Sequence, residues 1–294
     1  MNGGAVKTAF VVQVGENKDA LEAKLRSIGE MGFMGVELVL TEADENDAER
    51  LRLLCAAAHL EIAALNTDGA ALLDGLSLTS PDEELRQGAL ERLKNFIEIG
   101  EKLKCPVTVG ALMGSGLTDD WVRTIADGER HSDALLWFQE SINESAAKLK
   151  KGGCPCLLVQ PLNRYETSVI NTVDEGLAFL KELGNPRVKL QLDTFHMNIE
   201  EANIASAISR AGRHIGLIHL IDNNRHALGT GHMDFKTIVR GLRRIGYDGF
   251  AVGADISEYS LANSAEDTLK AMVNLDLWVS QSQRQQSFTC KDSG

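Results

Sequence analysis

The sequence predicts a (β/α)₈ barrel, in which eight parallel strands form a closed inner sheet inside a ring of helices. Two observations favour this fold. Short apolar runs with strand character alternate with helical patterns eight times along the chain of 294 residues. Polar clusters directly follow several of these runs, as in barrels whose active site lies at the carboxyl ends of the strands. A doubly wound open sheet is the alternative, but it rarely needs eight units, and the first run lacks a glycine-rich nucleotide fingerprint.

The first half of the chain contains four of the expected strand–helix pairs. Leu21, Leu25 and Ile28 recur at helical spacing, and Gly32 is expected to end that helix. Ser80 is expected to cap the third helix, because a proline and two acids follow it. The expected strands cover residues 8–14, 35–40, 61–66 and 106–112, and the expected helices cover 20–31, 48–60, 80–103 and a long segment ending near 151.

The second half repeats the same alternation. Gly184 and Gly212 are expected to end two of its helices. We therefore expect residues 1–280 to form a single barrel domain and the polar residues 281–294 to form a disordered tail. The expected strands cover residues 156–162, 188–193, 215–221 and 250–256, and the expected helices cover 173–183, 200–211, 235–245 and 262–280.

The composition narrows the range of partners. A formal charge of −12 and a pI near 5.1 argue against a nucleic-acid partner, because phosphate binding requires basic patches. No apolar run approaches the roughly 18 residues that a membrane span needs, so no membrane partner is expected. The five cysteines form no disulfide framework, which favours a cytoplasmic location. A small-molecule ligand is therefore expected, and the apolar helix faces are compatible with a homo-oligomer.

Two polar residues on neighbouring strands form a candidate metal pair. Asp193 ends the sixth expected strand, and His219 lies inside the seventh. A buried histidine beside an aspartate is a common arrangement for binding a divalent metal, although a hydrogen-bonded core histidine is the alternative for His219 alone. His196 follows Asp193 in the same turn, and this grouping favours a functional site.

Further polar residues are expected around that pair. Arg225 follows the seventh strand and provides a guanidinium for sugar hydroxyls or a phosphate, and Glu166 ends the loop after the fifth strand. Each taken alone also fits a surface loop. Glu37 in the second strand and Asn66 at the end of the third are weaker candidates for the same site at the strand ends. His232 is expected to order its own loop.

Three segments resemble a known enzyme family. They begin at Gln160, Asp193 and His219, and the last of them is followed by a Gly-Thr-Gly-His run that ends at His232. In full the three segments are Gln160-Pro-Leu-Asn-Arg-Tyr-Glu166, Asp193-Thr-Phe-His-Met-Asn-Ile-Glu-Glu201 and His219-Leu-Ile-Asp-Asn-Asn-Arg225, and the run that follows is Gly229-Thr-Gly-His232. They closely resemble the ketose 3-epimerases, the D-tagatose and D-psicose 3-epimerase group within the xylose-isomerase-like TIM barrels.

The resemblance implies a metal-assisted proton transfer on a keto sugar or related polyol. In the family a Mn²⁺ or similar ion is held by glutamates from strands five and eight, an aspartate from strand six and a histidine from strand seven. The two glutamates remove and return the proton on opposite faces of the sugar carbon. Carried over, Asp193 and His219 are metal ligands, and Glu166, His196 and Arg225 are substrate-binding residues.

The two glutamate positions depart from the family pattern. Gln160 stands at the strand-five position, where it offers a neutral amide oxygen to a metal but cannot act as a general base. Ala254 stands at the strand-eight position, and the neighbouring Asp255 reaches inward only if a bulge re-aims it. The expected metal set is therefore Gln160, Asp193, His219 and Asp255, with Gln160 and Asp255 at the catalytic positions. Such a set binds Mn²⁺, Co²⁺ or Mg²⁺ weakly, or not at all if no carboxylate replaces the missing ones.

The sequence thus predicts an isomerase of the sugar isomerase/epimerase type, with 3-epimerisation of a keto sugar as the expected reaction and activity that is reduced or absent. Three explanations for the departures stay open. In the first, the metal ligands have been rearranged, with Asp255 or Glu258 as the replacement for a missing carboxylate. In the second, the chain is a non-catalytic sugar-binding homologue or subunit. In the third, it is an altered form of an active enzyme. A DNA-repair nuclease on the same barrel would need a basic groove, which the net charge disfavours.

Overall fold

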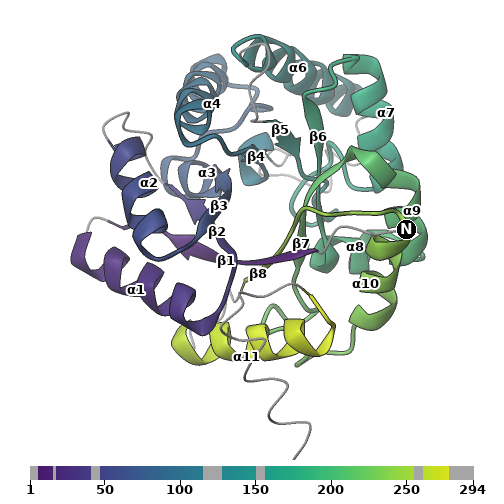
Figure 1. The fold of residues 1–294 in the computed structure, drawn as a ribbon. Coiled ribbons are helices and arrows are strands. Elements are labelled where there is room, and N and C mark those ends of the chain that lie inside the picture. The colour runs from purple at the N-terminus through teal and green to yellow at the C-terminus, as the bar shows by residue number, and fades with distance from the viewer. Residues whose placement is uncertain are drawn as a thin grey trace, which may run out of the picture.

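A computed structural model describes residues 6–15, 18–40, 47–114, 128–149, 156–254 and 261–277. Within these ranges eight parallel strands form a closed barrel in sequence order, β1 to β8, and β8 pairs with β1. The longer helices surround the strands as an outer ring (Figure 1). The (β/α)₈ prediction is confirmed. No helix in the described part of the chain is long and apolar enough to cross a membrane.

The element bounds follow the predicted order closely. The strands are β1 (Lys7–Gln13), β2 (Gly35–Val39), β3 (Glu61–Asn66), β4 (Val107–Val109), β5 (Leu157–Val159), β6 (Val188–Asp193), β7 (Ile215–Leu220) and β8 (Phe250–Gly253). The helices are α1 (Lys18–Met31), α2 (Asp47–Ala57), α3 (Asp68–Asp74), α4 (Glu83–Leu103), α6 (Gly128–Ala146), α7 (Val173–Leu183), α8 (Thr194–Glu200), α9 (Ile204–Ala211), α10 (Phe235–Arg244) and α11 (Leu261–Asn274), with 3₁₀ turns η1 (Ala111–Met113) and η2 (Gly212–His214).

Several local predictions were wrong. Asp82, not Ser80, caps α4, because its side chain accepts a hydrogen bond from the amide of Glu84 at 2.9 Å. Helix α3 follows β3 where a loop was expected, and the end of the fourth expected strand is the turn η1. The expected helix over 200–211 begins only at Ile204 as α9, with Asn203 as its cap, and the short α8 before it was not expected. The expected tail, residues 281–294, lies outside the described residues.

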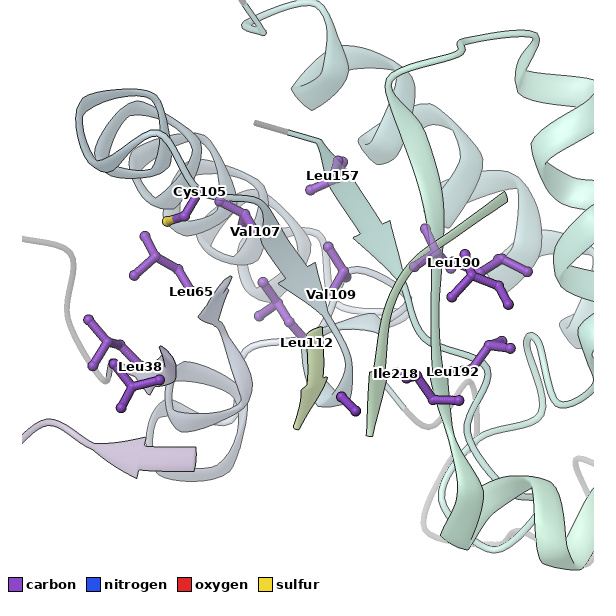
Figure 2. Packing of buried hydrophobic residues seen from close by; sticks show 14 of the residues in the cluster. Leu38, Leu65, Cys105, Val107, Val109, Leu112, Leu157, Leu190, Leu192 and Ile218 are labelled. Atoms are coloured by element: carbon purple, nitrogen blue, oxygen red, sulfur yellow. The ribbon is translucent and has the colours of Figure 1, made fainter. Parts of the chain in front are cut away.

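Strand alternation separates two apolar regions. Odd and even positions face opposite sides of each strand, so Leu157 joins the large cluster between strands and helices, whereas Leu158 faces the barrel interior. Figure 2 shows part of the outer cluster, including Val107, Leu157 and Leu190 from β4, β5 and β6. The inner cluster is small and includes Leu158, Leu217 and Val252. This inner cluster packs inside the barrel, below the polar residues at the carboxyl ends of the strands.

Candidate active site

A cavity of about 850 Å³ opens at the carboxyl ends of the strands. Its lining combines side chains from β1, β2, β3, β6 and β7 with those of segments that follow the strands. This is the position at which barrels of this fold place their active sites. The polar and charged lining residues are Gln13, Lys24, Asn66, Asp68, Ser77, Gln160, Glu166, Asp193, His196, His219 and Arg225.

His219 on β7 is paired with two carboxylates. Its Nε2 atom lies 2.5 Å from Oε2 of Glu37 on β2, and its Nδ1 atom lies 3.5 Å from Oδ2 of Asp193 on β6. Asn66 on β3 donates to the other oxygen of Glu37 at 2.9 Å. Glu37 is fully buried, and His219 is 5% exposed. The two groups therefore form an ion pair that is held out of water.

These contacts shift the ionisation of the pair. Burial lowers the pKa of His219, but the charges and hydrogen bonds of Glu37 and Asp193 outweigh burial and raise it to about 10. Burial raises the pKa of Asp193, but His196 and His219 outweigh it, so that the pKa lies below its usual value. His219 is therefore an imidazolium at neutral pH, and Asp193 is a carboxylate.

Two buried glutamines surround the pair. Gln160, which directly follows β5, donates from Nε2 to Oδ2 of Asp193 at 3.4 Å, and its Oε1 atom has no hydrogen-bond partner. The amide of Gln191 on β6 lies 3.0 Å from Nε2 of His219, and its Oε1 atom also has no partner. Because an imidazolium nitrogen donates, turning the Gln191 amide would bring its oxygen against the ring. The Gln160 oxygen remains a buried acceptor beside the cavity.

The substrate-binding residues expected from the sequence meet at one rim. The backbone amide of Asn163 donates to Nδ1 of His196 at 3.2 Å, so that nitrogen is an acceptor and the ring proton lies on Nε2. Nε2 in turn faces Oδ2 of Asp193 at 3.8 Å. The Asn163 side chain donates to Oε1 of Glu166 at 3.0 Å, and Arg225 donates to the same oxygen at 2.7 Å. Glu166, His196 and Arg225 therefore act as one hydrogen-bonded group.

Local structure fixes this rim. The guanidinium of Arg225 stacks over the ring of Phe195, 3.9 Å from its centroid, which keeps the long side chain extended. Asp193 caps α8 by accepting from the Phe195 amide at 2.8 Å, so the end of β6 and the start of α8 form one rigid turn. Buried Asp222 accepts from the amides of Gly229 and Gly231 at 3.0 and 2.9 Å, which folds the next loop against the rim.

The expected divalent metal requires several anionic or neutral donors around one point. Within the described ranges, no three His, Cys, Asp or Glu residues are arranged to hold a metal ion. Asp193 supplies one carboxylate, Gln160 supplies only a neutral amide, and Nε2 of His219 already faces Glu37. These donors do not fit a firmly bound divalent ion. The metal centre stays a prediction.

The structure brings together most residues singled out in the sequence. Gln160, Asp193, His219 and Ala254 line the cavity with the three rim residues. Asp255 and Glu258 lie outside the described residues. The side chain of His232 is exposed, and its backbone amide donates to Asn223 at 2.9 Å, so this residue belongs to the loop rather than the cavity.

Sequence reasoning missed four residues. Asn163 and Phe195 lie within the quoted motifs, but only the folded loop shows that they orient His196 and Arg225. Gln191 shares a face with Asp193 by strand alternation, a signal that could have identified it. Asp68 follows β3 in a segment expected to be a plain connection, and nothing in its neighbours marked it.

Known proteins similar to the chain cover most of its length. The family described as the xylose isomerase-like TIM barrel matches residues 25–275. The L-ribulose 3-epimerase of Mesorhizobium japonicum is 30% identical over 247 residues, which are 81% of this chain and 76% of that protein. The D-psicose 3-epimerase of Enterocloster bolteae is 47% identical over 177 residues, which are 60% of this chain and 56% of that protein.

Solved structures agree with the fold. A structure of L-ribulose 3-epimerase has a TM-score of 0.74 at 22% identity and covers 97% of this chain and 98% of its own. A D-psicose 3-epimerase from Clostridium cellulolyticum, solved with D-tagatose, has the same TM-score and identity and covers 93% of this chain and 100% of its own. At such identity the likeness concerns the fold, whereas the family match extends over most of the sequence. The chain belongs to the xylose isomerase-like TIM barrel family.

Proposed function

We propose that this protein is a sugar isomerase/epimerase-type enzyme that binds a keto sugar and transfers a proton at the carbon next to its carbonyl. The observation that carries this proposal is the convergence of Glu166, His196 and Arg225 on one rim of a cavity whose wall holds Asp193 and His219. Curated relatives are named L-ribulose, D-psicose and ketose 3-epimerases, which supports 3-epimerisation as the reaction.

The rim has the chemistry that a polyhydroxylated ligand requires. Arg225 supplies fixed donors, Glu166 supplies acceptor oxygens, and His196 supplies one N–H from Nε2. The guanidinium and the carboxylate hold each other in place before a ligand arrives, which reduces the entropy lost on binding. We therefore assign sugar hydroxyl binding to these three residues and proton transfer to groups on the wall of the cavity.

We propose that a divalent ion, with Mn²⁺ the expected species and Co²⁺ or Mg²⁺ as alternatives, binds weakly at most. The reason is the donor chemistry of Asp193, His219 and Gln160, which has one anionic side chain and one amide where a firm site needs more negative charge. His219 would also have to lose its proton and its contact with Glu37 before it could bind the ion.

A second candidate function is sugar binding without catalysis. Gln160 cannot act as a general base, and Ala254 presents no functional group to the cavity. A protein of this kind would bind ketoses through Glu166, His196 and Arg225 but would not exchange their carbon-bound protons. Turnover therefore distinguishes the two candidates, whereas binding is common to both.

Replacing Arg225 tests the binding rim. Arg225→Lys is expected to weaken ketose binding by about 10- to 100-fold, because an ammonium cannot reproduce the planar fork that bonds Glu166 and stacks on Phe195. Isothermal titration with D-psicose, D-tagatose and L-ribulose measures the change. Arg164→Lys is the matched control, because Arg164 pairs with Glu200 at 2.8 Å on the surface and does not line the cavity. Equal affinities for wild type and Arg225→Lys, or no ketose binding at all, would contradict the proposed site.

A further inference from the structure

Three carboxyl groups of the described residues line the cavity, and they differ in their partners. Glu166 is bonded to Arg225 and Asn163. Asp193 lies between His196 and His219. Asp68 forms no ion pair with any side chain in the described ranges, and its Oδ1 atom accepts a hydrogen bond from the amide of Ala111 at 2.7 Å. Asp68 is therefore the cavity carboxyl group that no side chain in the described ranges holds in an ion pair, although the charge of His219 acts on it.

Asp68 is held rigidly at the edge of the barrel interior. Its backbone amide donates to Oδ1 of Asn66 at 2.7 Å, and Asn66 is bonded to Glu37. A Cβ atom placed on Gly110 would lie 2.5 Å from Oδ1 of Asp68 and 2.7 Å from Oε1 of Gln160. The two oxygens thus both approach the Cα atom of Gly110, where a side chain would clash with them. Oε1 of Gln160 is buried and has no hydrogen-bond partner, so it is an acceptor that lacks a donor.

We propose that Asp68 is the catalytic acid–base residue of the proton transfer and that the Gln160 oxygen beside it accepts a hydroxyl of the substrate. This inference rests on the proposed function, because it assigns the group that moves the proton in that reaction. The environment of Asp68 agrees with the role. Burial and the charge of Glu37 raise the pKa of Asp68, whereas the Ala111 and Asn66 hydrogen bonds and the charge of His219 lower it, and the net shift lies above the usual value.

The step balances without a further reactant. The Asp68 carboxylate takes the proton from the carbon next to the carbonyl, and the electron pair of that C–H bond forms the C=C bond of an enediolate. The carbonyl π electrons move onto the carbonyl oxygen. The carboxylic acid then returns a proton to the same carbon, and the carbonyl re-forms. Return to the original face, after the acid has exchanged its proton with water, gives solvent exchange, and formation of the epimer requires a second proton donor on the opposite face.

Solvent exchange tests the assignment directly. The wild-type protein is incubated with D-psicose, D-tagatose or L-ribulose in D₂O, and loss of the carbon-bound proton is followed by ¹H NMR. Asp68→Asn is expected to reduce exchange by about 100-fold or more, because an amide cannot take the proton, while ketose affinity changes less than roughly threefold. The asparagine oxygen can still accept from Ala111, so the fold is retained. Asp68→Ser provides a second variant without a carboxyl group.

The control is Asp74→Asn, the same change at the exposed end of the same helix, where Asp74 pairs with Arg92 at 3.0 Å. It should exchange at the wild-type rate. Wild-type exchange rates in both Asp68 variants would overturn the role of Asp68 while leaving the proposed function standing. A wild-type protein that binds ketoses but exchanges none would overturn this inference and favour the sugar-binding alternative. A wild-type protein that neither binds nor exchanges them would overturn the proposed function itself.

Discussion

The double variant Gln160→Glu/Ala254→Glu is expected to bind Mn²⁺ about 100-fold more tightly than the wild-type protein and to gain 3-epimerase activity. Both side chains line the cavity with Asp193 and His219, so the two changes add anionic donors to the wall that holds these residues. Two carboxylates on the barrel wall also provide the pair of bases that epimerisation from opposite faces requires. Either single variant is expected to show a smaller gain.

The same variant is expected to be less stable without metal. A carboxylate at residue 160 would lie close to Asp193, which Gln160 now approaches at 3.4 Å, and like charges in a buried site repel. Mn²⁺ at roughly 100 times its dissociation constant should restore about 2.7 kcal/mol. Thermal unfolding in EDTA and in Mn²⁺ measures this change, and titration calorimetry measures the affinity.

Gln87→Glu on the exposed face of α4 is the matched control, because it adds the same charge far from the cavity. It should leave both metal affinity and metal-dependent stability unchanged. Restored Mn²⁺ binding without turnover of any ketose would mean that the assigned substrate class is wrong. Unchanged Mn²⁺ affinity would mean that these two positions do not belong to one metal site.

Glu37→Gln is expected to lower the free energy of unfolding by about 3 kcal/mol at a pH below 6.5, because it leaves the buried charge of His219 without its nearest partner. The pKa of His219 is raised from 6.5 to about 10, so the stabilisation from its charge is complete below about pH 6.5 and is lost as the pH rises through about 10. The difference between wild type and variant should therefore be widest at acid pH and narrow toward pH 10.

Urea unfolding at roughly pH 6, 8 and 10 measures this dependence. Glu61→Gln is the control, since Glu61 on the neighbouring strand pairs with Lys7 at 2.7 Å in an ion pair whose side chains are 53% and 35% exposed. Screening by water limits such a pair to well under about 1 kcal/mol. A Glu37→Gln protein as stable as Glu61→Gln at every pH would contradict the buried ion pair.

Most of the fold could be predicted because its signals are local. The bounds of α7 and β6 were predicted to the residue, since a glycine follows α7 and apolar alternation runs through β6. Helices α3 and α8 were missed, and both have only seven residues. So short a helix has too little propensity of its own to be recognised, and contacts made after folding stabilise it, such as the Asp193 cap of α8.

In the candidate site, too, only some of the residues could be predicted from the sequence. Asp193 and His219 could be paired from sequence because they lie in register on adjacent strands. Glu37 could not be identified from sequence as the partner of His219, because it lies 182 residues away and reaches His219 across the barrel interior. The role of Asp68 was hidden for a similar reason: it depends on Gly110 and Gln160, which different strands bring beside it.

By itself the sequence determined that this chain forms a (β/α)₈ barrel and that its polar residues gather at the strand ends. These properties follow from the period of the apolar pattern and from residue identity, which need no knowledge of distant contacts. The tertiary structure alone decided that His219 is paired with Glu37 and that Asp68 lines the cavity without an ion pair to any described side chain. Closure of the barrel decides both, because it converts large separations in sequence into contacts of a few ångströms and excludes the water that would otherwise screen them.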